Sequence, residues 1–228
     1  MAPHSDAEFA MNNMQQNEKA TAACSLTPKG LERQKRILDA AREVFLEQGY
    51  DNASINDIMC RAGGSLSTLY RLFGSKLGLF EAMMEQTSNQ VFAAFQAFEC
   101  SIKRQETPEQ ALKRYARLLL ERVLSPEAVG LYRLITTDCS SEREQIQQLF
   151  YAQGPRRINE KLAAYLRTQV EQGALVIDNP ELAAFQFVDM VKGQFQLRAM
   201  LGMTITNAEL DEAVEQAVGI FLRGTAPR

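Results

Sequence analysis

The sequence predicts an all-α fold of about nine or ten helices. Apolar residues recur at spacings of three, four and seven along most of the chain after residue 28, which is the pattern of helices that bury one face. No segment combines two-residue alternation with β-branched enrichment, so a sheet is not expected. The 228 residues are 46% hydrophobic and 23% charged, as in globular proteins with a substantial core.

The first 28 residues differ from the rest of the chain. They are rich in Asn, Gln, Ser and Ala and lack apolar periodicity, so we expect a flexible tail. The segment from Leu31 to Gln48 then predicts the first helix, and Gly49 provides a stop just beyond its end. The residues expected to form its buried face are Ile37, Leu38, Ala41, Val44 and Phe45.

Three further helices follow at short intervals. Ser54 can cap the second helix, which must end at Gly63-Gly64. Ser65 can cap a third, short helix, and Gly74-Ser75 ends it. The fourth helix is predicted over 76–105. Two short helices joined by a glycine-containing turn and preceded by a packing helix form a helix-turn-helix plan.

Proline and glycine divide the remainder of the chain. Each Pro falls where a helix can start without losing a hydrogen bond. We expect helix boundaries at Thr107-Pro108, Ser125-Pro126, Gly154-Pro155, Gly173, Asn179-Pro180 and 204–207. The predicted organisation is therefore a tail (1–28), a three-helix helix-turn-helix domain (29–76) and a larger helical domain (77–228).

Composition excludes several functional classes. The chain has a single histidine, His4, so imidazole catalysis and most histidine-built metal sites are not expected. Its four cysteines form no CxxC pair, which argues against a zinc ribbon and suits a reducing cytosol. No apolar run is long enough to cross a bilayer. We expect a cytoplasmic protein that is not an enzyme, needs no cofactor and has no membrane partner.

Charge is distributed unevenly along the chain. The net charge is −3, but residues 29–76 carry eight basic and six acidic side chains, a balance of +2. The tail carries −2 and residues 77–228 carry −3. A basic unit joined to a larger acidic one is consistent with a nucleic-acid partner for the first unit.

The predicted third helix carries the chemistry for DNA recognition. Short hydroxyl side chains can donate to phosphates and reach base edges, and arginine can pair bidentately with guanine. Helix N-termini add free amides and the positive end of a dipole. The candidate residues on this helix are Ser65, Ser67, Thr68 and Arg71.

Four strings stand in order within some forty residues of the predicted helix-turn-helix domain. They are Ile37-Leu38-Asp39-Ala40-Ala41 with Phe45, Gly49-Tyr50, Ser54 with Ile58, and the segment from Ala62 to Phe73 followed by Ser75-Lys76. With these strings, residues 33–93 resemble the DNA-binding domain of TetR-family transcriptional regulators. About fifteen positions match the family pattern in order, and the match covers about a quarter of the chain.

The resemblance implies roles for particular positions. It implies phosphate contacts from Ser54, Tyr70 and Lys76, and groove contacts from Ser65, Ser67, Thr68 and Arg71. Two positions depart from the pattern. Leu66 stands where the family commonly has Lys or another polar residue, and it either touches a thymine methyl group or packs on a neighbouring helix. Gly64 replaces a small apolar residue, and its conformational freedom is expected to loosen the turn.

The larger domain is marked by aromatic and methionine side chains on predicted helices. Such residues form a core or line an apolar cavity between helices. The candidate pocket residues are Phe92, Phe95, Tyr115, Tyr132 and Met190. The run from Phe150 to Gly173, with the glycines beyond it, resembles the AefR-type C-terminal subgroup.

The last two long helices, 180–201 and 207–223, carry apolar stripes that cover the chain's own core or pair with a second copy. The TetR resemblance implies that they form a dimer interface. The candidate residues are Phe185, Val188, Val214, Val218 and Phe221.

Together these observations predict a ligand-responsive repressor. We expect a homodimer to bind a palindromic operator in double-stranded DNA and to be released by a small apolar or amphipathic effector. Two other classes stay open, namely a helical protein-interaction adaptor and an enzyme that uses a base other than histidine. A gel shift on the protein's own promoter region, with and without a metabolite library, separates all three.

Overall fold

A computed structural model describes the chain over residues 27–102 and 106–227, with side chains left aside at 94 and 96–102. Most of the predicted tail, including His4, lies outside these residues. The chain divides into two units, 1–36 and 37–228. In the first unit, residues 28–36 form the start of helix α2. The rest of α2 and all the later helices belong to the second unit.

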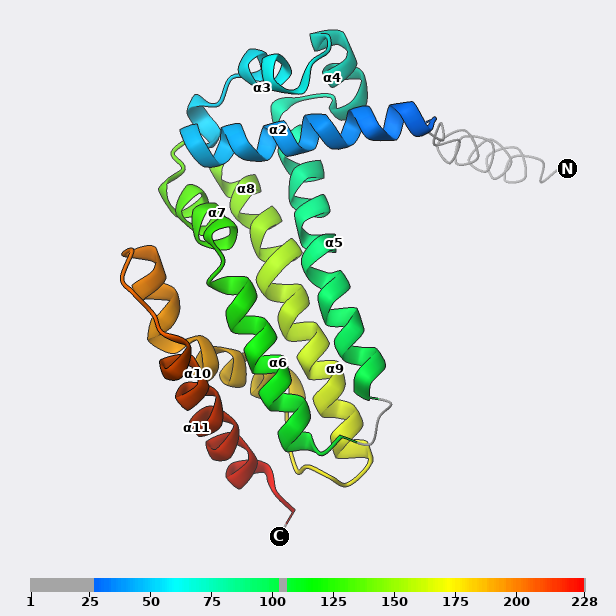
Figure 1. Ribbon diagram of the computed structural model, residues 1–228. Coiled ribbons are helices and arrows are strands. Elements are labelled where there is room, and N and C mark those ends of the chain that lie inside the picture. Colours follow the sequence, from blue (N-terminus) through cyan, green and yellow to red (C-terminus); the bar gives the residue numbers. More distant parts are fainter. Residues whose placement is uncertain (1–26, 103–105, 228) are drawn as a thin grey trace, which may run out of the picture. The chain divides into compact units, whose positions relative to one another are not determined.

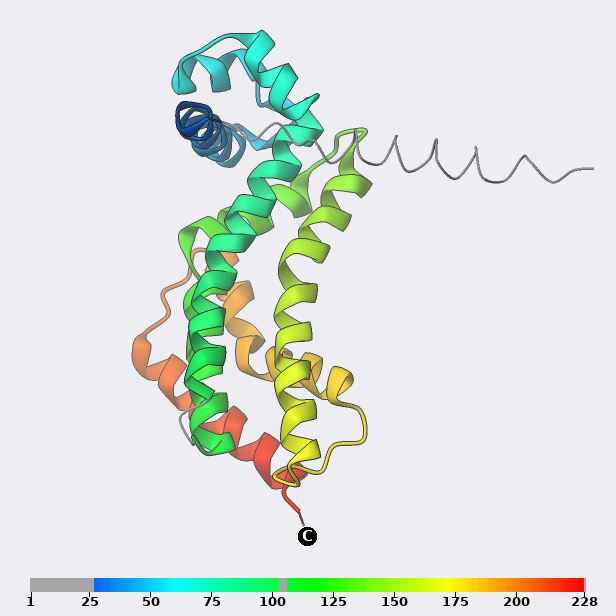
Figure 2. The same cartoon turned by 90° about the vertical axis from the view of Figure 1, so that its right-hand side faces the viewer.

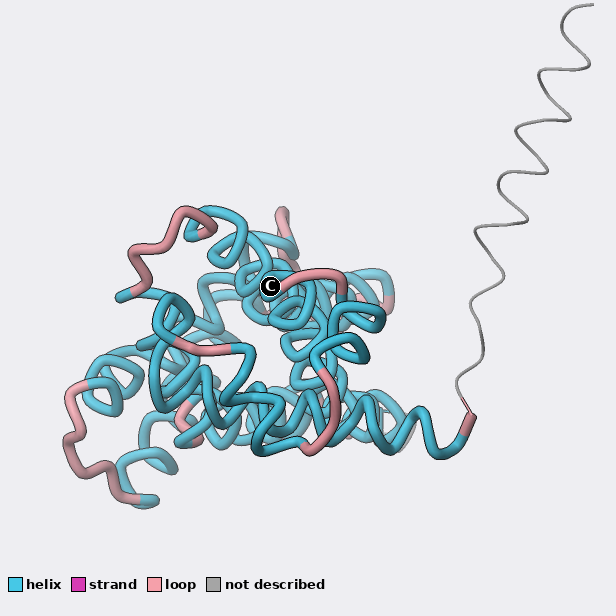
Figure 3. Tube along the Cα trace, turned by 90° about the horizontal axis from the view of Figure 1, so that it is seen from above, coloured by secondary structure: helices cyan, strands magenta, loops and turns pink. Residues whose placement is uncertain are grey.

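Within the described ranges the chain is helical throughout, which confirms the predicted all-α fold. The described residues contain ten α-helices and one π-helical segment. Because α8, η1 and α9 follow one another without a break, they form one continuous rod, and the described residues form nine rods in all. Short loops join them (Figure 3). The elements are α2 (Pro28–Asn52), α3 (Ile55–Ala62), α4 (Leu66–Phe73), α5 (Lys76–Ile102), α6 (Pro108–Val123), α7 (Pro126–Thr137), α8 (Arg143–Tyr151), η1 (Ala152–Arg156), α9 (Arg157–Glu171), α10 (Pro180–Met200) and α11 (Asn207–Thr225).

The longest helices build the body of this unit. Helix α5 lies beside the rod formed by α8, η1 and α9, and Figures 1 and 2 show the two running alongside each other. Helix α10 packs against α9 and α6, and α11 packs against α6. None of the helices in the part of the chain that the structure describes is long and apolar enough to span a membrane.

Two hydrophobic clusters fill this arrangement. One combines apolar side chains of α2, α3 and α4 with the start of α5 and with residues of α7 and α8, among them Phe45, Leu69, Phe80 and Leu131. The other lies between α5, α6, α9, α10 and α11. Helix α5 contributes to both clusters, so the predicted division after residue 76 falls within a helix-turn-helix core that extends to Met84.

A charged capping arrangement holds the start of α11. The Oε1 atom of Glu209 accepts from Arg198 Nη1 at 2.7 Å, and Oε2 accepts from the backbone N–H of Thr206 at 2.8 Å. These bonds favour the carboxylate, and they lower the pKa of Glu209 to about 2. Because the unfolded chain has a pKa near 4.5, this carboxylate stabilises the fold fully above pH 4.5 and loses that effect as the pH falls towards 2.

We therefore expect Glu209→Gln to be less stable than the parent protein at pH 7, with the difference narrowing between pH 5 and pH 2. Glutamine can still form the capping box, so the substitution removes only the charge. Urea unfolding at several pH values measures this difference. A difference that stays constant down to pH 2 would show that the Glu209 charge does not stabilise the fold.

Candidate DNA interface and effector pocket

Helices α3 and α4 form a capped helix-turn-helix. The Ser54 hydroxyl accepts from the backbone N–H of Asn56 at 3.1 Å and opens α3. The turn follows at Gly63 (φ 69°) and Gly64 (φ 143°). A Cβ at Gly64 would also lie only 3.1 Å from Met59 Cε. This backbone conformation and close contact favour glycine at position 64, and the expected loosening of the turn stays a prediction.

The sides of α4 differ in exposure. Leu69 is fully buried and joins α4 to the core of α2 and α3. The opposite side exposes Ser67, Tyr70 and Arg71. Leu66 lies there too, with 42% of its surface exposed, which favours the thymine-methyl alternative over packing on a neighbouring helix.

The N-terminus of α4 is closed by a hydroxyl cluster. Ser65 Oγ accepts from the backbone N–H of Thr68 at 3.3 Å, and it lies 2.9 Å from Ser67 Oγ and 3.0 Å from Thr68 Oγ1. Thr68 is only 9% exposed. Its predicted groove contact is therefore not supported, because its hydroxyl supports the cap from inside. Ser65 and Ser67 stay exposed at this end.

Lys76 braces the end of α2. Its Nζ donates to the Asp51 carbonyl at 2.9 Å and lies 4.8 Å from the centre of the Tyr50 ring. Partial burial lowers the pKa of Lys76. The phosphate contact predicted for this residue stays a prediction, and the structure adds a local bracing role.

Tyr50, which belongs to the Gly49-Tyr50 string, pairs with Glu142 and so connects α2 to the start of α8. The Tyr50 hydroxyl donates a hydrogen bond to Glu142 Oε2 at 2.5 Å. The pKa of Tyr50 is raised, mainly because the side chain is partly buried and also because of this hydrogen bond. Nothing in the local sequence pairs two residues 92 positions apart.

The two arginines near the turn differ in their surroundings. Arg61, on α3, donates to Glu47 Oε1 at 2.8 Å and lies 3.7 Å from Glu43 Oε2. Arg71, on the exposed side of α4, forms no ion pair within the part of the chain that the structure describes. The groove contact predicted for Arg71 stays a prediction, and its exposure is consistent with it.

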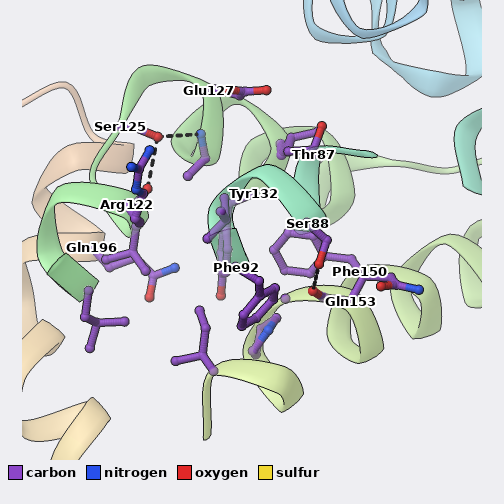
Figure 4. A pocket seen from close by; sticks show the side chains of 18 of the residues that line it. Thr87, Ser88, Phe92, Arg122, Ser125, Glu127, Tyr132, Phe150, Gln153 and Gln196 are labelled. Carbon is purple, nitrogen blue, oxygen red and sulfur yellow. Dashed lines mark hydrogen bonds between the residues drawn. The ribbon is translucent and has the colours of Figure 1, made fainter. Parts of the chain in front are cut away.

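The larger unit contains a cavity of about 340 Å³. Its wall is formed by α5, α6, α7, the α8–η1–α9 rod and α10. The lining includes Phe92, Tyr132 and Phe150 with Ser88 and Gln153, as Figure 4 shows, together with other side chains. The volume lies at the lower end of the range of about 300–1,000 Å³ for small-molecule sites.

The structure brings only part of the predicted pocket together. Phe92 and Tyr132 line the cavity. Phe95 and Tyr115 lie in the core, where their rings pack 5.3 Å apart and Tyr115 donates its hydroxyl to the Ile158 carbonyl at 2.9 Å. Met190 is exposed on α10. Aromatic content alone did not separate core from cavity, because both environments select the same side chains.

The cavity wall also contains residues that were not among the predicted pocket residues. The Gly154-Pro155 pair was expected to separate two helices, which is wrong: the pair lies inside the continuous rod, within the π-helical segment. A π-helical segment inside a rod is a frequent mark of a functional site. Gln153, Gly154, Pro155 and Asn159 therefore line the cavity from this rod.

Most residues predicted for the dimer interface are buried within the chain's own core. Val188, Val214, Val218 and Phe221 are buried, and only Phe185 is exposed. A side chain covered by its own chain cannot cover a second copy, so the interface assignment of these four residues needs correction. The exposed apolar residues of α10, α11 and the loop between them are Leu182, Phe185, Met190, Leu197, Leu201, Met203 and Ile220.

Two family models match the chain. Residues 37–83 match the bacterial regulatory proteins of the tetR family, and residues 110–224 match the C-terminal domain of AefR-like transcriptional repressors. The first match spans the helix-turn-helix. The second spans half of the chain and includes most of the cavity wall.

Individual relatives agree with these matches. The HTH-type transcriptional regulator YvkB of Bacillus subtilis is 24% identical over 83% of this chain and 95% of its own length. The HTH-type transcriptional activator FasR of Mycolicibacterium smegmatis is 30% identical over 48% of this chain and 56% of its own.

Solved structures show the same fold. A TetR-family regulator from Mesorhizobium loti superposes with a TM-score of 0.77 at 25% identity, covering 86% of this chain and 97% of that one. The flavonoid-responsive regulator FrrA gives 0.71 at 27% identity, covering 86% and 98%. The chain belongs to the TetR family of DNA-binding transcriptional regulators, a non-enzymatic family, and carries an AefR-like C-terminal domain.

Proposed function

We propose that the protein is a cytoplasmic repressor that binds a palindromic operator as a homodimer and is released by a small effector in the cavity. The observation that carries this proposal is that α7 forms part of the cavity wall and also packs against α2 of the helix-turn-helix core. Ligand binding can therefore act directly on the element that supports α4.

The proposal that the protein represses transcription, and does not activate it, is based on the match of its C-terminal half. The AefR-like match covers 110–224 and is described as a repressor domain. FasR, described as an activator, is similar over only about half of this chain. FrrA is described as flavonoid-responsive and is similar over most of the chain, which supports control by a small molecule.

DNA binding is proposed to use α4 in the major groove. Two copies related by a two-fold axis would place two α4 helices about one helical turn apart, so the operator should be palindromic. Leu66, Ser67 and Arg71 would face the bases, while Ser54 and Tyr70 would contact phosphates from either side.

Three contacts connect the cavity to the helix-turn-helix core. Glu127 lines the cavity and accepts from Arg42 Nη1 at 3.3 Å. Gly130 of α7 faces α2 so closely that a Cβ there would lie 3.0 Å from Leu46 Cδ2. Leu131 belongs both to the cavity wall and to the helix-turn-helix core. A ligand that displaces α7 must therefore change the support of α2.

A gel-shift assay on the protein's own promoter region, with and without a metabolite library, tests this function. We expect a specific shift that one or more compounds reverse, since a coupling of about 1–3 kcal/mol measurably weakens DNA binding. A folded protein that ignores every duplex at low ionic strength would refute DNA regulation. Such a result would favour an adaptor or an enzyme.

Arg42→Gln is expected to weaken communication between the two sites without changing the cavity lining. Arg42 contacts Glu127 but does not line the cavity. We expect the effector-induced loss of operator affinity to shrink by about two- to fivefold, the scale of a partly exposed ion pair. Operator affinity is measured with and without a saturating library compound that releases DNA.

Glu160→Gln provides the matched control for this measurement. It breaks an ion pair with Arg156, 2.7 Å long, and Glu160 does not line the cavity. The control should leave the effector response unchanged. An Arg42→Gln response equal to that of the parent protein would place the communication elsewhere.

A further inference from the structure

The π-helical segment shapes the polar part of the cavity. Pro155 lies inside it and has no N–H to donate to the preceding turn. Two carbonyls of the segment accept bonds from side chains: Gln153 O accepts from Ser88 Oγ at 2.5 Å, and Pro155 O accepts from Asn159 Nδ2 at 2.8 Å. Ser88 and Asn159 are thus held in fixed orientations beside the cavity.

This arrangement determines which way the Asn159 amide faces. A carbonyl can only accept, so the NH₂ group must be the one that points at Pro155 O, and the oxygen must point the other way. Asn159 is only 5% exposed, and its Oδ1 atom is buried without a hydrogen-bond partner among the described residues. Asn159 also lines the cavity. The wall of the cavity therefore includes a side chain whose buried acceptor has no partner among the described residues.

Aromatic rings form the apolar part of the same space. Phe92, Tyr132 and Phe150 surround it (Figure 4). The Tyr132 and Phe150 rings meet edge to face with centres 5.9 Å apart, and the Arg157 guanidinium lies 4.1 Å from the centre of the Phe92 ring. Rings held in this way favour a flat aromatic partner, which stacks on faces and edges.

Two of the three charged residues of the lining are paired. Lys192 pairs with Asp189 at 2.8 Å and Glu127 pairs with Arg42 at 3.3 Å, while Arg122 is exposed to solvent. A carboxylate or an ammonium group placed at the buried Asn159 amide would lose its hydration, and an uncharged group avoids that cost.

We propose that the effector is a flat, uncharged aromatic compound whose hydroxyl group donates a hydrogen bond to Asn159 Oδ1. This inference rests on the proposed function, because it assigns the chemistry of the effector cavity. The rings provide apolar contact, and the amide oxygen selects the compounds that carry a donor.

Four probes of similar shape test this selection: 2-naphthol, naphthalene, 2-methoxynaphthalene and 2-naphthoate. Calorimetric titration of the full-length protein should show 2-naphthol binding about tenfold more tightly than naphthalene and 2-methoxynaphthalene, since one buried acceptor gains its donor. 2-Methoxynaphthalene has an oxygen atom at the same position as 2-naphthol, but it has no O–H group to donate. The charged carboxylate should bind most weakly. These four titrations need no variant, so they test the inference even if a substitution prevents folding.

Asn159→Ala should remove the preference, bringing the 2-naphthol to naphthalene affinity ratio close to one. Gln196→Ala is the matched control, because Gln196 is another polar residue of the lining and should leave the ratio unchanged. Melting temperatures show whether each variant is folded. Equal affinities of the parent protein for 2-naphthol and 2-methoxynaphthalene, or a preference that survives Asn159→Ala, would overturn the assignment of ligand class.

The operator gel shift distinguishes this failure from failure of the proposed function. Probes that bind without hydroxyl preference but release DNA would leave the function standing and refute only the ligand class. A hydroxyl preference without any release would support the ligand chemistry and refute effector control. If no probe binds, the ligand class is refuted, and the gel shift with the metabolite library alone decides the proposed function.

Discussion

Replacing Leu197 and Leu201 together by glutamate is expected to convert the protein from dimer to monomer. These residues are 60% and 68% exposed, at the end of α10, which makes them among the most exposed large apolar side chains of the described chain. Exposed apolar residues of this kind mark interaction surfaces. Two copies of each charge at a two-fold interface would be desolvated and would repel each other.

The expected consequence is loss of operator binding. A monomer contacts one half-site instead of two, so affinity for the palindrome should fall by about 100-fold or more. Sedimentation measures the oligomeric state, and gel shifts measure the affinity. Leu197 and Leu201 are better targets than Val214 and Val218, because charge at the two buried valines would disrupt the fold itself.

Val176→Glu is the control for the double variant. Val176 is 59% exposed and lies between α9 and α10, outside both helices of the proposed interface. This variant should stay dimeric and bind DNA as the parent protein does. A Leu197→Glu/Leu201→Glu protein that sediments as a dimer would show that the interface uses another surface.

The second large effect is expected from Arg71→Ala. An arginine that pairs with a base edge contributes about 1–3 kcal/mol per subunit, so a dimer should lose about 30-fold or more in operator affinity. The loss should be larger on the operator than on random duplex DNA, because a groove contact carries sequence preference. Affinities for both DNAs at several salt concentrations measure this difference.

Arg61→Ala is the matched comparison. Arg61 lies on the neighbouring helix, but Glu43 and Glu47 hold its guanidinium. We expect operator affinity to change by less than about threefold, since its exposed ion pairs add little. An equal loss from both substitutions would show that the two arginines act through overall charge, and that Arg71 does not read the bases.

Most of the helix-turn-helix that forms the candidate DNA interface could be predicted from the sequence, because its determinants are local. Ser54 and Ser65 were expected as caps, and each accepts a backbone N–H two or three residues ahead of it. The burial of Thr68 could not be predicted in this way. Whether Thr68 lies on the exposed or the buried side of α4 depends on how α4 is rotated against α2 and α3, because each step of one residue along a helix turns the side chain by about 100°.

The cavity was much less predictable. Asn159 is an ordinary polar residue in a helical pattern, and the carbonyl that its NH₂ group contacts belongs to a proline that was expected at the start of a helix. The π-helical segment is possible because α5 packs against it and provides Ser88. No local rule would have found this contact between residues 65 positions apart.

Local chemistry thus determined the helices, their caps, the helix-turn-helix and the family, since hydrophobic periodicity, capping hydroxyls and turn glycines act within a few residues of each other. Only the tertiary structure decided which apolar stripes are buried and which remain available, as Val218 and Leu201 show. The physical reason is that an apolar side chain gains the same free energy from either partner, its own core or a second copy, so periodicity alone cannot distinguish them.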